Sequence, residues 1–196
     1  MKTRLNLLAL AGLSLGLFTS ASAAVETYVI DPVHSSVGFS IRRFFAKVPG
    51  SFTTFGGNIV VDREHPEKNS VEATIDIGSI NTADPKRDEH LRSPDFFDAA
   101  KFTQITFKST AWKKTGDDAY DVTGALTMHG VTKEVVLKVK LLGIMPGMRP
   151  GSQLSGWEAS TTLKRADFGV NGPAMLGNML GADVEVSINV SADSKS

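Results

Sequence analysis

Apolar and polar side chains alternate with a period of two along most of this chain, and no other feature constrains its fold as strongly. Val37, Phe39 and Ile41 share one face of an extended segment, and Val184 and Val186 do the same near the other end. This spacing is typical of strands with one apolar and one polar face. Helical patterns do not alternate with these strands, which disfavours a parallel sheet. The sequence therefore predicts an all-β protein with one or two short helices.

The predicted strands number about eight or nine and are joined mostly by short polar turns. They cover residues 28–30, 36–41, 52–61, 71–77, 104–111, 120–128, 135–141, 154–163 and 184–190. Gly56-Gly57 lies inside the third of them, and glycines within a strand indicate a bend or bulge. Strands with one apolar face can form two packed sheets or a closed barrel, and the alternation leaves both open. An up-and-down barrel of about eight strands would have room for side chains or one small ligand.

One stretch, residues 79–98, breaks the alternation and predicts a short helix. Asp84-Pro85 supplies a favourable N-cap followed by a first helical residue that needs no amide donor. So short a helix is marginal in water and must be held by the rest of the fold. We expect Leu91, Phe96 and Phe97 to hold it by packing on apolar strands.

Residues 1–23 have the pattern of a cleavable export signal. Lys2 and Arg4 precede an apolar run from Leu5 to Phe18, and Ala21-Ser22-Ala23 supplies the small residues of a cleavage site. The run is short and interrupted by glycine, so we expect no permanent membrane anchor. Residues 24–196 would then form a single soluble domain.

Charge and cysteine content exclude several classes of site. Without Lys2 and Arg4, the 21 basic residues become 19 against 21 acidic ones, a net charge of −2. This balance offers no single-sign field to recruit nucleic acid or an anionic membrane surface. The sequence contains no cysteine, which excludes disulfides, a thiol nucleophile, a thiolate metal site and a lipid-modified cysteine.

A glycine-rich region at residues 169–182 carries apolar side chains at helical spacing. Met175, Leu176, Met179 and Leu180 form this pattern. Methionine adapts to irregular ligands, so the region could be a soft lid over a cavity. A short helix that plugs one end of the core explains the spacing equally well. As a lid, it would gate a cavity together with the loop at Met145 to Met148.

Distinctive short segments follow one another through the chain after the predicted signal. They are Tyr28-Val29-Ile30-Asp31-Pro32-Val33-His34-Ser35, Gly50-Ser51-Phe52, Ile75-Asp76, Ser79-Ile80-Asn81-Thr82, Arg87-Asp88-Glu89-His90-Leu91-Arg92-Ser93-Pro94-Asp95-Phe96-Phe97, Ile105-Thr106-Phe107-Lys108-Ser109, Gly124-Ala125-Leu126-Thr127-Met128-His129-Gly130-Val131-Thr132-Lys133 and Arg165-Ala166-Asp167-Phe168-Gly169. Together and in this order, they resemble the YceI family of exported lipid- or polyisoprenoid-binding proteins.

The resemblance implies a lipocalin-like antiparallel barrel whose elongated interior holds a long apolar chain. Its ligand would be an amphiphile such as a polyisoprenoid, an isoprenoid quinone or a fatty acyl derivative. The resemblance implies binding and carriage in the periplasm, without a catalytic reaction or a cofactor other than the bound lipid. Release from the cell and the oligomeric state, a homodimer included, stay open.

A long tail would be lined by apolar residues from the inward faces of the strands and from the methionine-rich region. The candidates are Phe39, Ile41, Phe52, Phe55, Ile75, Phe107, Leu126, Leu137, Trp157, Met175, Leu176, Met179 and Val186.

Polar residues in the resembling segments are candidates for either a head-group contact or a structural cluster. They are His34, Arg43, Arg87, His90, His129 and Arg165. For the helix, the structural interpretation is favoured, because Asp88 and Arg92 can pair with each other one turn apart, or with Arg165 and Asp167. Arg43 stands where the resembling family often has histidine, which leaves the head-group preference open.

Two alternative functions remain. An enzyme of lipid or isoprenoid metabolism could use His34, His90 or His129, although their spacing in the sequence does not suggest a metal site and no nucleophile elbow is present. A stress-related interaction module would instead have a filled core without a cavity.

Overall fold

In the computed structural model, which describes residues 25–177 and 179–194, eleven strands form one antiparallel sheet. The strands are β1 Glu26–Ile30, β2 Ser36–Arg43, β3 Ala46–Phe52, β4 Phe55–Val61, β5 Ser70–Asp76, β6 Ile80–Asn81, β7 Gln104–Gly116, β8 Ala119–Met128, β9 Val131–Pro146, β10 Gln153–Lys164 and β11 Leu180–Ser194. The predicted export signal, residues 1–23, lies outside the described residues.

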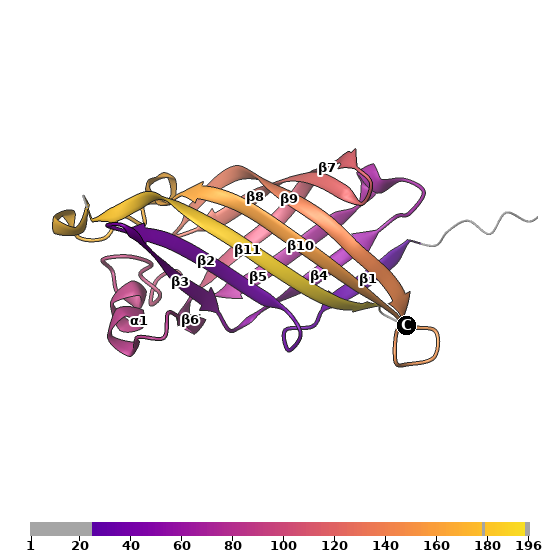
Figure 1. Cartoon of the computed structure of the whole chain (residues 1–196), viewed down its shortest axis with the longest axis horizontal. Helices are drawn as coiled ribbons and strands as arrows, with labels where there is room; N and C mark the ends of the chain where they lie inside the picture. The colour runs from indigo at the N-terminus through magenta and orange to yellow at the C-terminus, as the bar shows by residue number, and fades with distance from the viewer. Residues whose placement is uncertain (1–24, 178, 195–196) are drawn as a thin grey trace, which may run out of the picture.

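The sheet closes on itself into an eight-stranded barrel. β11 makes the closure by pairing with β1, where Tyr28 lies opposite Ser194 and Ile30 opposite Ala192. The closed ring follows the order β1, β4, β5, β7, β8, β9, β10 and β11. Figure 1 shows the result as an elongated barrel with strongly tilted strands. The all-β prediction is confirmed, and of the two architectures left open the structure is the barrel.

Three further strands extend the ring at one end. β2 pairs with the first part of β11, β3 pairs with β2, and β6 pairs with β3. β1 and β2 therefore lie in line along β11, and β3 and β4 lie in line beside them. The chain leaves the ring after β5 and returns to it at β7, and the segment between them forms this end of the barrel.

The prediction of one continuous strand over residues 52–61 is wrong, because β3 ends at Phe52 and β4 begins at Phe55. The interruption falls at Thr53-Thr54, between β3 and β4, where the Thr54 amide donates to Ser79 Oγ at 3.0 Å. Gly56-Gly57, the predicted bend, stays in the regular ladder with β5. A Cβ on Gly57 would lie 2.2 Å from the Glu72 carbonyl oxygen, so glycine here permits a close approach of two backbones.

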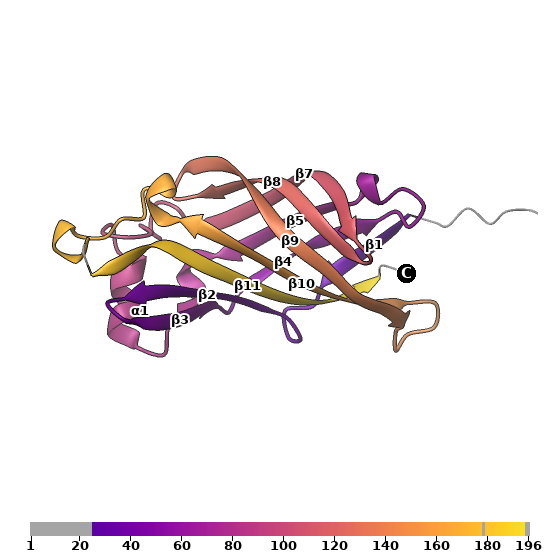
Figure 2. The same cartoon turned by 45° about the horizontal axis from the view of Figure 1, so that its top comes forward.

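The predicted helix is α1, Pro85–Arg92, and its N-cap is Asp84 as expected. The Asp84 side chain accepts hydrogen bonds from the amides of Lys86 and Arg87. Figures 1 and 2 both place α1 at the end of the barrel where β2, β3 and β6 extend the ring. Among the described residues, no helix has the length and apolar character that crossing a membrane would require.

Asp88 does not form the predicted pair with Arg92 or Arg165 in the described part of the chain. Its buried carboxylate accepts from the Thr82 amide at 2.8 Å and from Thr82 Oγ1 at 2.5 Å. Arg87 donates to the Thr82 hydroxyl and carbonyl oxygens, both at 2.7 Å. The charged residues of α1 therefore fix the helix to the strand end that precedes it.

The apolar contacts of α1 and the following turn are confirmed. Phe96 is buried in a core cluster with strand residues such as Phe52 and Met128, and Leu91 and Phe97 pack against the same cluster. The Phe97 ring lies edge-on to Phe52, with centroids 6.2 Å apart. These three side chains hold the helical segment across the end of the barrel.

Replacing Asp88 with alanine should lower the free energy of unfolding by about 1–3 kcal/mol, because the buried Thr82 amide loses its acceptor. Asp88→Asn keeps one acceptor oxygen and should lose less. Arg92→Ala should change stability little, since Arg92 is not the partner of Asp88. Urea denaturation of the three variants measures these differences. Equal losses in Asp88→Ala and Arg92→Ala would contradict the observed bonding.

Candidate ligand-binding cavity

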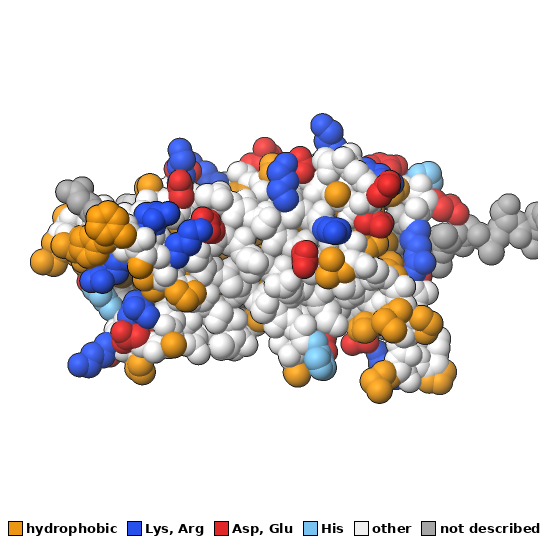
Figure 3. Space-filling model, in the orientation of Figure 1, with side chains coloured by type: hydrophobic (Ala, Val, Ile, Leu, Met, Phe, Trp, Pro, Cys, Tyr) orange, Lys and Arg blue, Asp and Glu red, His pale blue; other side chains and the backbone are white. Residues whose placement is uncertain are grey.

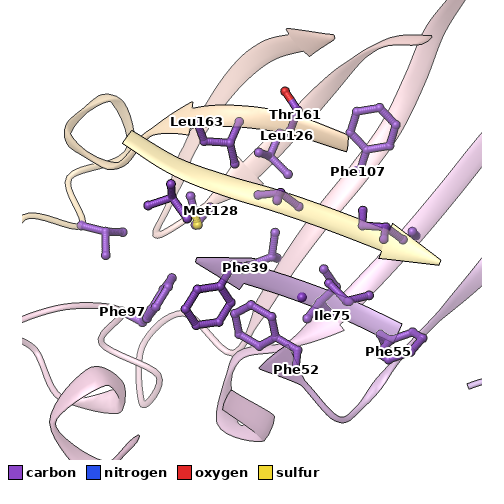
Figure 4. Close-up of a pocket in the computed structure, with 18 of the residues that line it drawn as sticks. Phe39, Phe52, Phe55, Ile75, Phe97, Phe107, Leu126, Met128, Thr161 and Leu163 are labelled. Atoms are coloured by element: carbon purple, nitrogen blue, oxygen red, sulfur yellow. The ribbon is translucent and has the colours of Figure 1, made fainter. Parts of the chain in front are cut away.

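A cavity of about 700 Å³ occupies the interior of the barrel. Its walls are the inward faces of the strands, as the period of two requires. Figure 4 shows Phe39, Phe52 and Phe97 side by side along one wall, with Met128 and Leu163 across from them. The lining is apolar along nearly its whole length, which is typical of sites for small apolar ligands.

One aromatic wall depends on a glycine in the neighbouring strand. Phe39 of β2 lies opposite Gly50 of β3, and a Cβ on Gly50 would come within 2.3 Å of the Phe39 ring. Glycine therefore lets the ring lie flat against the wall, where it also contacts Phe52 at a centroid distance of 5.6 Å. A larger residue at position 50 would push the ring into the cavity.

The end of the cavity away from α1 is closed by aromatic residues of a second core cluster. Trp112 and Trp157 line the cavity, are buried, and pack edge-on with ring centroids 6.0 Å apart. Their indole nitrogens donate to Ser109 Oγ and Ser155 Oγ, which satisfies both polar atoms within the wall. Tyr28, which has no exposed surface, belongs to the same cluster.

The end of the cavity near α1 is its mouth. Three of the lining residues are exposed to solvent: Arg43 at the end of β2, and Lys86 and His90 of α1. The other charged lining residues, Asp84 and Arg87, belong to the same helical segment. Arg165, which follows β10, completes the set. The cavity thus has an apolar body and a charged rim at one end.

Most of the predicted lining residues do line this cavity. They are Phe39, Ile41, Phe52, Phe55, Ile75, Phe107, Leu126, Leu137, Trp157, Leu176 and Val186. Met175 and Met179 do not: the Met175 side chain is 79% exposed, and Met179 lies outside the lining. Met175 belongs to a single 3-10 turn, Ala174–Leu176, whose Leu176 lines the cavity, and Met179 follows this turn, so the helical spacing misplaced the two methionines.

The loop at Met145 to Met148 also lies outside the cavity lining. It begins in the last residues of β9, and Figure 1 shows the turn after this strand at the end of the barrel opposite α1. Exposed apolar side chains gather at both ends of the molecule (Figure 3), with Phe44 and Phe45 in the β2–β3 turn and Met145 and Met148 at the other end. The two predicted gates therefore do not face each other, and in the described part of the chain the exposed lining residues lie at the α1 end.

The structure separates the predicted polar residues into two groups. Arg43, Arg87, His90 and Arg165 line the cavity, whereas His34 and His129 do not. His34 lies on the surface, where a hydrogen bond with Asp31, 2.6 Å away, raises the pKa of its imidazole.

The three histidines of the resembling segments, His34, His90 and His129, are not brought together into one site. His129 lies in the β8–β9 turn, 3.2 Å from the Phe168 carbonyl oxygen and edge-on to Phe102. His90 Nε2 lies 2.8 Å from Asp95 Oδ2, within the helical segment. In the described residues, no group of three or more histidine, aspartate or glutamate side chains is placed to hold a metal ion.

Several lining residues were missed by the sequence analysis. They include Val37, Val48, Ile59, Phe97, Ile105, Trp112, Met128, Val135, Val139, Leu163, Val184, Ile188 and Val190. Many share a strand face with a residue that was named, as Val184 and Ile188 do with Val186. Their alternation was visible, but the sequence did not show which inward side chains border empty space.

A family model described as a YceI-like domain matches residues 28–192. Protein YceI of Salmonella agona is 42% identical over 176 residues, which cover 86% of this chain and 90% of that protein.

Solved structures share the architecture. The YceI protein of Campylobacter jejuni superposes with a TM-score of 0.70 at 30% identity, over 78% of this chain and 88% of that one. A polyisoprenoid binding domain from Saccharophagus degradans, implicated in plant cell wall breakdown, gives a TM-score of 0.65 at 17% identity, over 86% and 98%. The second likeness concerns the fold alone.

Proposed function

The chain belongs to the family of YceI-like domains, and from this we propose that its barrel binds an amphiphile with a long apolar tail. The ligand is a polyisoprenoid, an isoprenoid quinone or a fatty acyl derivative. The protein sequesters or carries this ligand through an aqueous compartment, and the proposal includes no catalytic step.

The observation that carries the proposal is the division of the cavity into an apolar body and a charged rim. Every charged lining residue belongs to the rim near α1, and the opposite end is closed by Trp112 and Trp157. An amphiphile has the same division, since its tail avoids water and its head group does not. The name of the Saccharophagus degradans domain agrees with this class of ligand. The cavity also favours this proposal over the filled interaction module considered above.

Burial of the tail would supply most of the affinity. Each methylene removed from water contributes about 0.8 kcal/mol, so about ten methylenes contribute roughly 8 kcal/mol before the cost of association. The net affinity is smaller by that cost, and it rises roughly fourfold with each further methylene that the cavity buries. Few polar contacts are therefore required, and the tail length matters more than any single side chain of the wall.

We place this activity in the periplasm, on the basis of the predicted export signal at residues 1–23. A carrier there would move a lipid between membranes without being anchored to either of them. N-terminal sequencing of the protein from a periplasmic extract, beginning at Ala24, would support this location.

The proposal is tested by gentle purification followed by native mass spectrometry and organic extraction. We expect one long-chain lipid for each protein molecule, released by the solvent and identified by its mass. Protein freed of lipid should take up a long-chain amphiphile again. Preparations that are reproducibly empty and take up none would overturn the proposal.

A further inference from the structure

The charges at the mouth of the cavity are predominantly positive. The lining contains Arg43, Lys86, Arg87 and Arg165, against the single carboxylate of Asp84. All of them lie near α1, although the predicted exported chain as a whole carries a slight excess of acidic residues. The fold thus concentrates positive charge at the mouth, and the net charge of the chain does not show this.

Two of the four cations are used by the protein itself. Arg165 donates to the backbone carbonyl oxygens of Gly181, Val170 and Asn171, which ties the start of β11 and the segment before it to the residue that follows β10. Arg87 donates to the hydroxyl and carbonyl oxygens of Thr82. These arginines build the mouth, and most of their donors are already bonded.

Asp84 is likewise occupied. Its carboxylate caps α1 through the amides of Lys86 and Arg87, and it lies 4.0 Å from the Arg87 guanidinium. It is therefore engaged with the helix N-terminus and with a cation that has its own structural bonds. Its charge does not neutralise the remaining two cations.

In the described residues, Arg43 and Lys86 are the lining cations whose side-chain hydrogen-bond donors are not engaged by the protein. Within the described residues, neither side chain makes a hydrogen bond or an ion pair, and the only contact of Arg43 is with the Phe44 ring, 5.3 Å from its guanidinium carbon. Both residues are exposed to water and also line the mouth of the cavity. A ligand with its tail inside the barrel would present its head group to these two residues.

We infer that the ligand carries an anionic head group, a carboxylate or a phosphate monoester, which Arg43 and Lys86 bind at the mouth. This inference rests on the proposed function and specifies its ligand class. Arginine can hold either oxyanion through two parallel hydrogen bonds, and lysine adds a point charge. Neutral amphiphiles of the same tail length bind more weakly, since they leave both cations without a partner.

The test compares palmitate and hexadecyl phosphate with hexadecan-1-ol, which shares their tail length but is uncharged. Binding to lipid-free protein is followed by the fluorescence of Trp112 and Trp157, which line the cavity. We expect the two anions to bind about tenfold or more tightly than the alcohol, as charge-assisted hydrogen bonds allow. The double variant Arg43→Gln with Lys86→Gln should remove this preference and leave alcohol binding unchanged.

Arg92→Gln is the matched control, because Arg92 lies on α1 but does not line the cavity. It should keep the full preference for anions. Equal binding of anions and alcohol by the unmodified protein would overturn the anionic head group and leave the proposed function standing. Failure to bind any of the three would overturn the proposed function itself. Binding of inorganic phosphate as tightly as hexadecyl phosphate would show a free-anion site and would overturn the inference.

Discussion

Replacing Ala159 with phenylalanine should weaken binding of a long-chain ligand about a hundredfold while the barrel stays folded. Ala159 lines the cavity from β10, midway between Val139 of β9 and Ile188 of β11. A phenyl ring there would displace roughly four methylenes of a tail, at about 0.8 kcal/mol each. The resulting loss of about 3 kcal/mol corresponds to more than a hundredfold in the dissociation constant.

The adjacent position supplies the control. Ser160 follows Ala159 on the same strand and faces outward, so Ser160→Phe adds the same ring without reducing the cavity. Its ligand affinity should match that of the unmodified protein. Titration with a long-chain amphiphile measures both affinities, and urea denaturation reports the stability of each variant. If Ala159→Phe stays folded and binds as tightly as Ser160→Phe, the tail does not occupy this part of the barrel.

Replacing Tyr28 with alanine should lower the free energy of unfolding by about 3–5 kcal/mol, the usual cost of truncating a large buried aromatic side chain. Tyr28 has no exposed surface and lies where β1 joins β4 to β11, opposite Ile59 on one side and Ser194 on the other. Its hydroxyl donates to Glu26 Oε2 at 2.6 Å. The substitution therefore opens a void at the seam that closes the barrel.

Tyr28→Phe separates the ring from the hydroxyl. It keeps the packing and should cost only about 1 kcal/mol, the usual contribution of one hydrogen bond. Thermal or urea denaturation measures both variants. A loss in Tyr28→Phe as large as in Tyr28→Ala would show that the hydroxyl network, and not the packing of the ring, closes the seam.

The same residue predicts how stability changes in alkali. Burial raises the pKa of the Tyr28 hydroxyl from 10.0 to about 12, so the folded state holds this proton more tightly than the unfolded chain does. The stabilisation is complete below pH 10.0 and is lost as the pH rises toward about 12. Burial also raises the pKa of Tyr120, which adds to the loss. Tyr28→Phe should therefore lose less stability than the unmodified protein between these pH values.

The alternation of side chains predicted which residues face the interior, because that choice depends only on the local period of two. Phe107, Leu126 and Val186 were placed inward on this basis, and all three line the cavity. The break at Thr53-Thr54 could not be predicted in the same way. It depends on Ser79, which meets Thr54 only after the chain has folded back across β5.

The charged residues of α1 show a second limit. The spacing of Asp88 and Arg92 allows an ion pair on one helix, but a buried carboxylate is better satisfied by the Thr82 amide and hydroxyl, which point at it directly. Arg43 and Lys86 are 43 residues apart and belong to no common motif or charge pattern. The sequence therefore could not show that both line the same mouth. Only the fold brings the end of β2 and the first turn of α1 to the same end of the barrel.

The way β11 closes the barrel has a consequence for the order in which the chain can fold. This strand of 15 residues pairs with β10, β1 and β2, so it joins elements from the two extremes of the described chain. Until it is in place, β10 presents an unpaired edge, and so do β1 and β2, which lie in line; such an edge is a template for aggregation. Contacts so distant in sequence form slowly. Chaperone protection of the incomplete barrel would therefore matter most in the interval before its last strand docks.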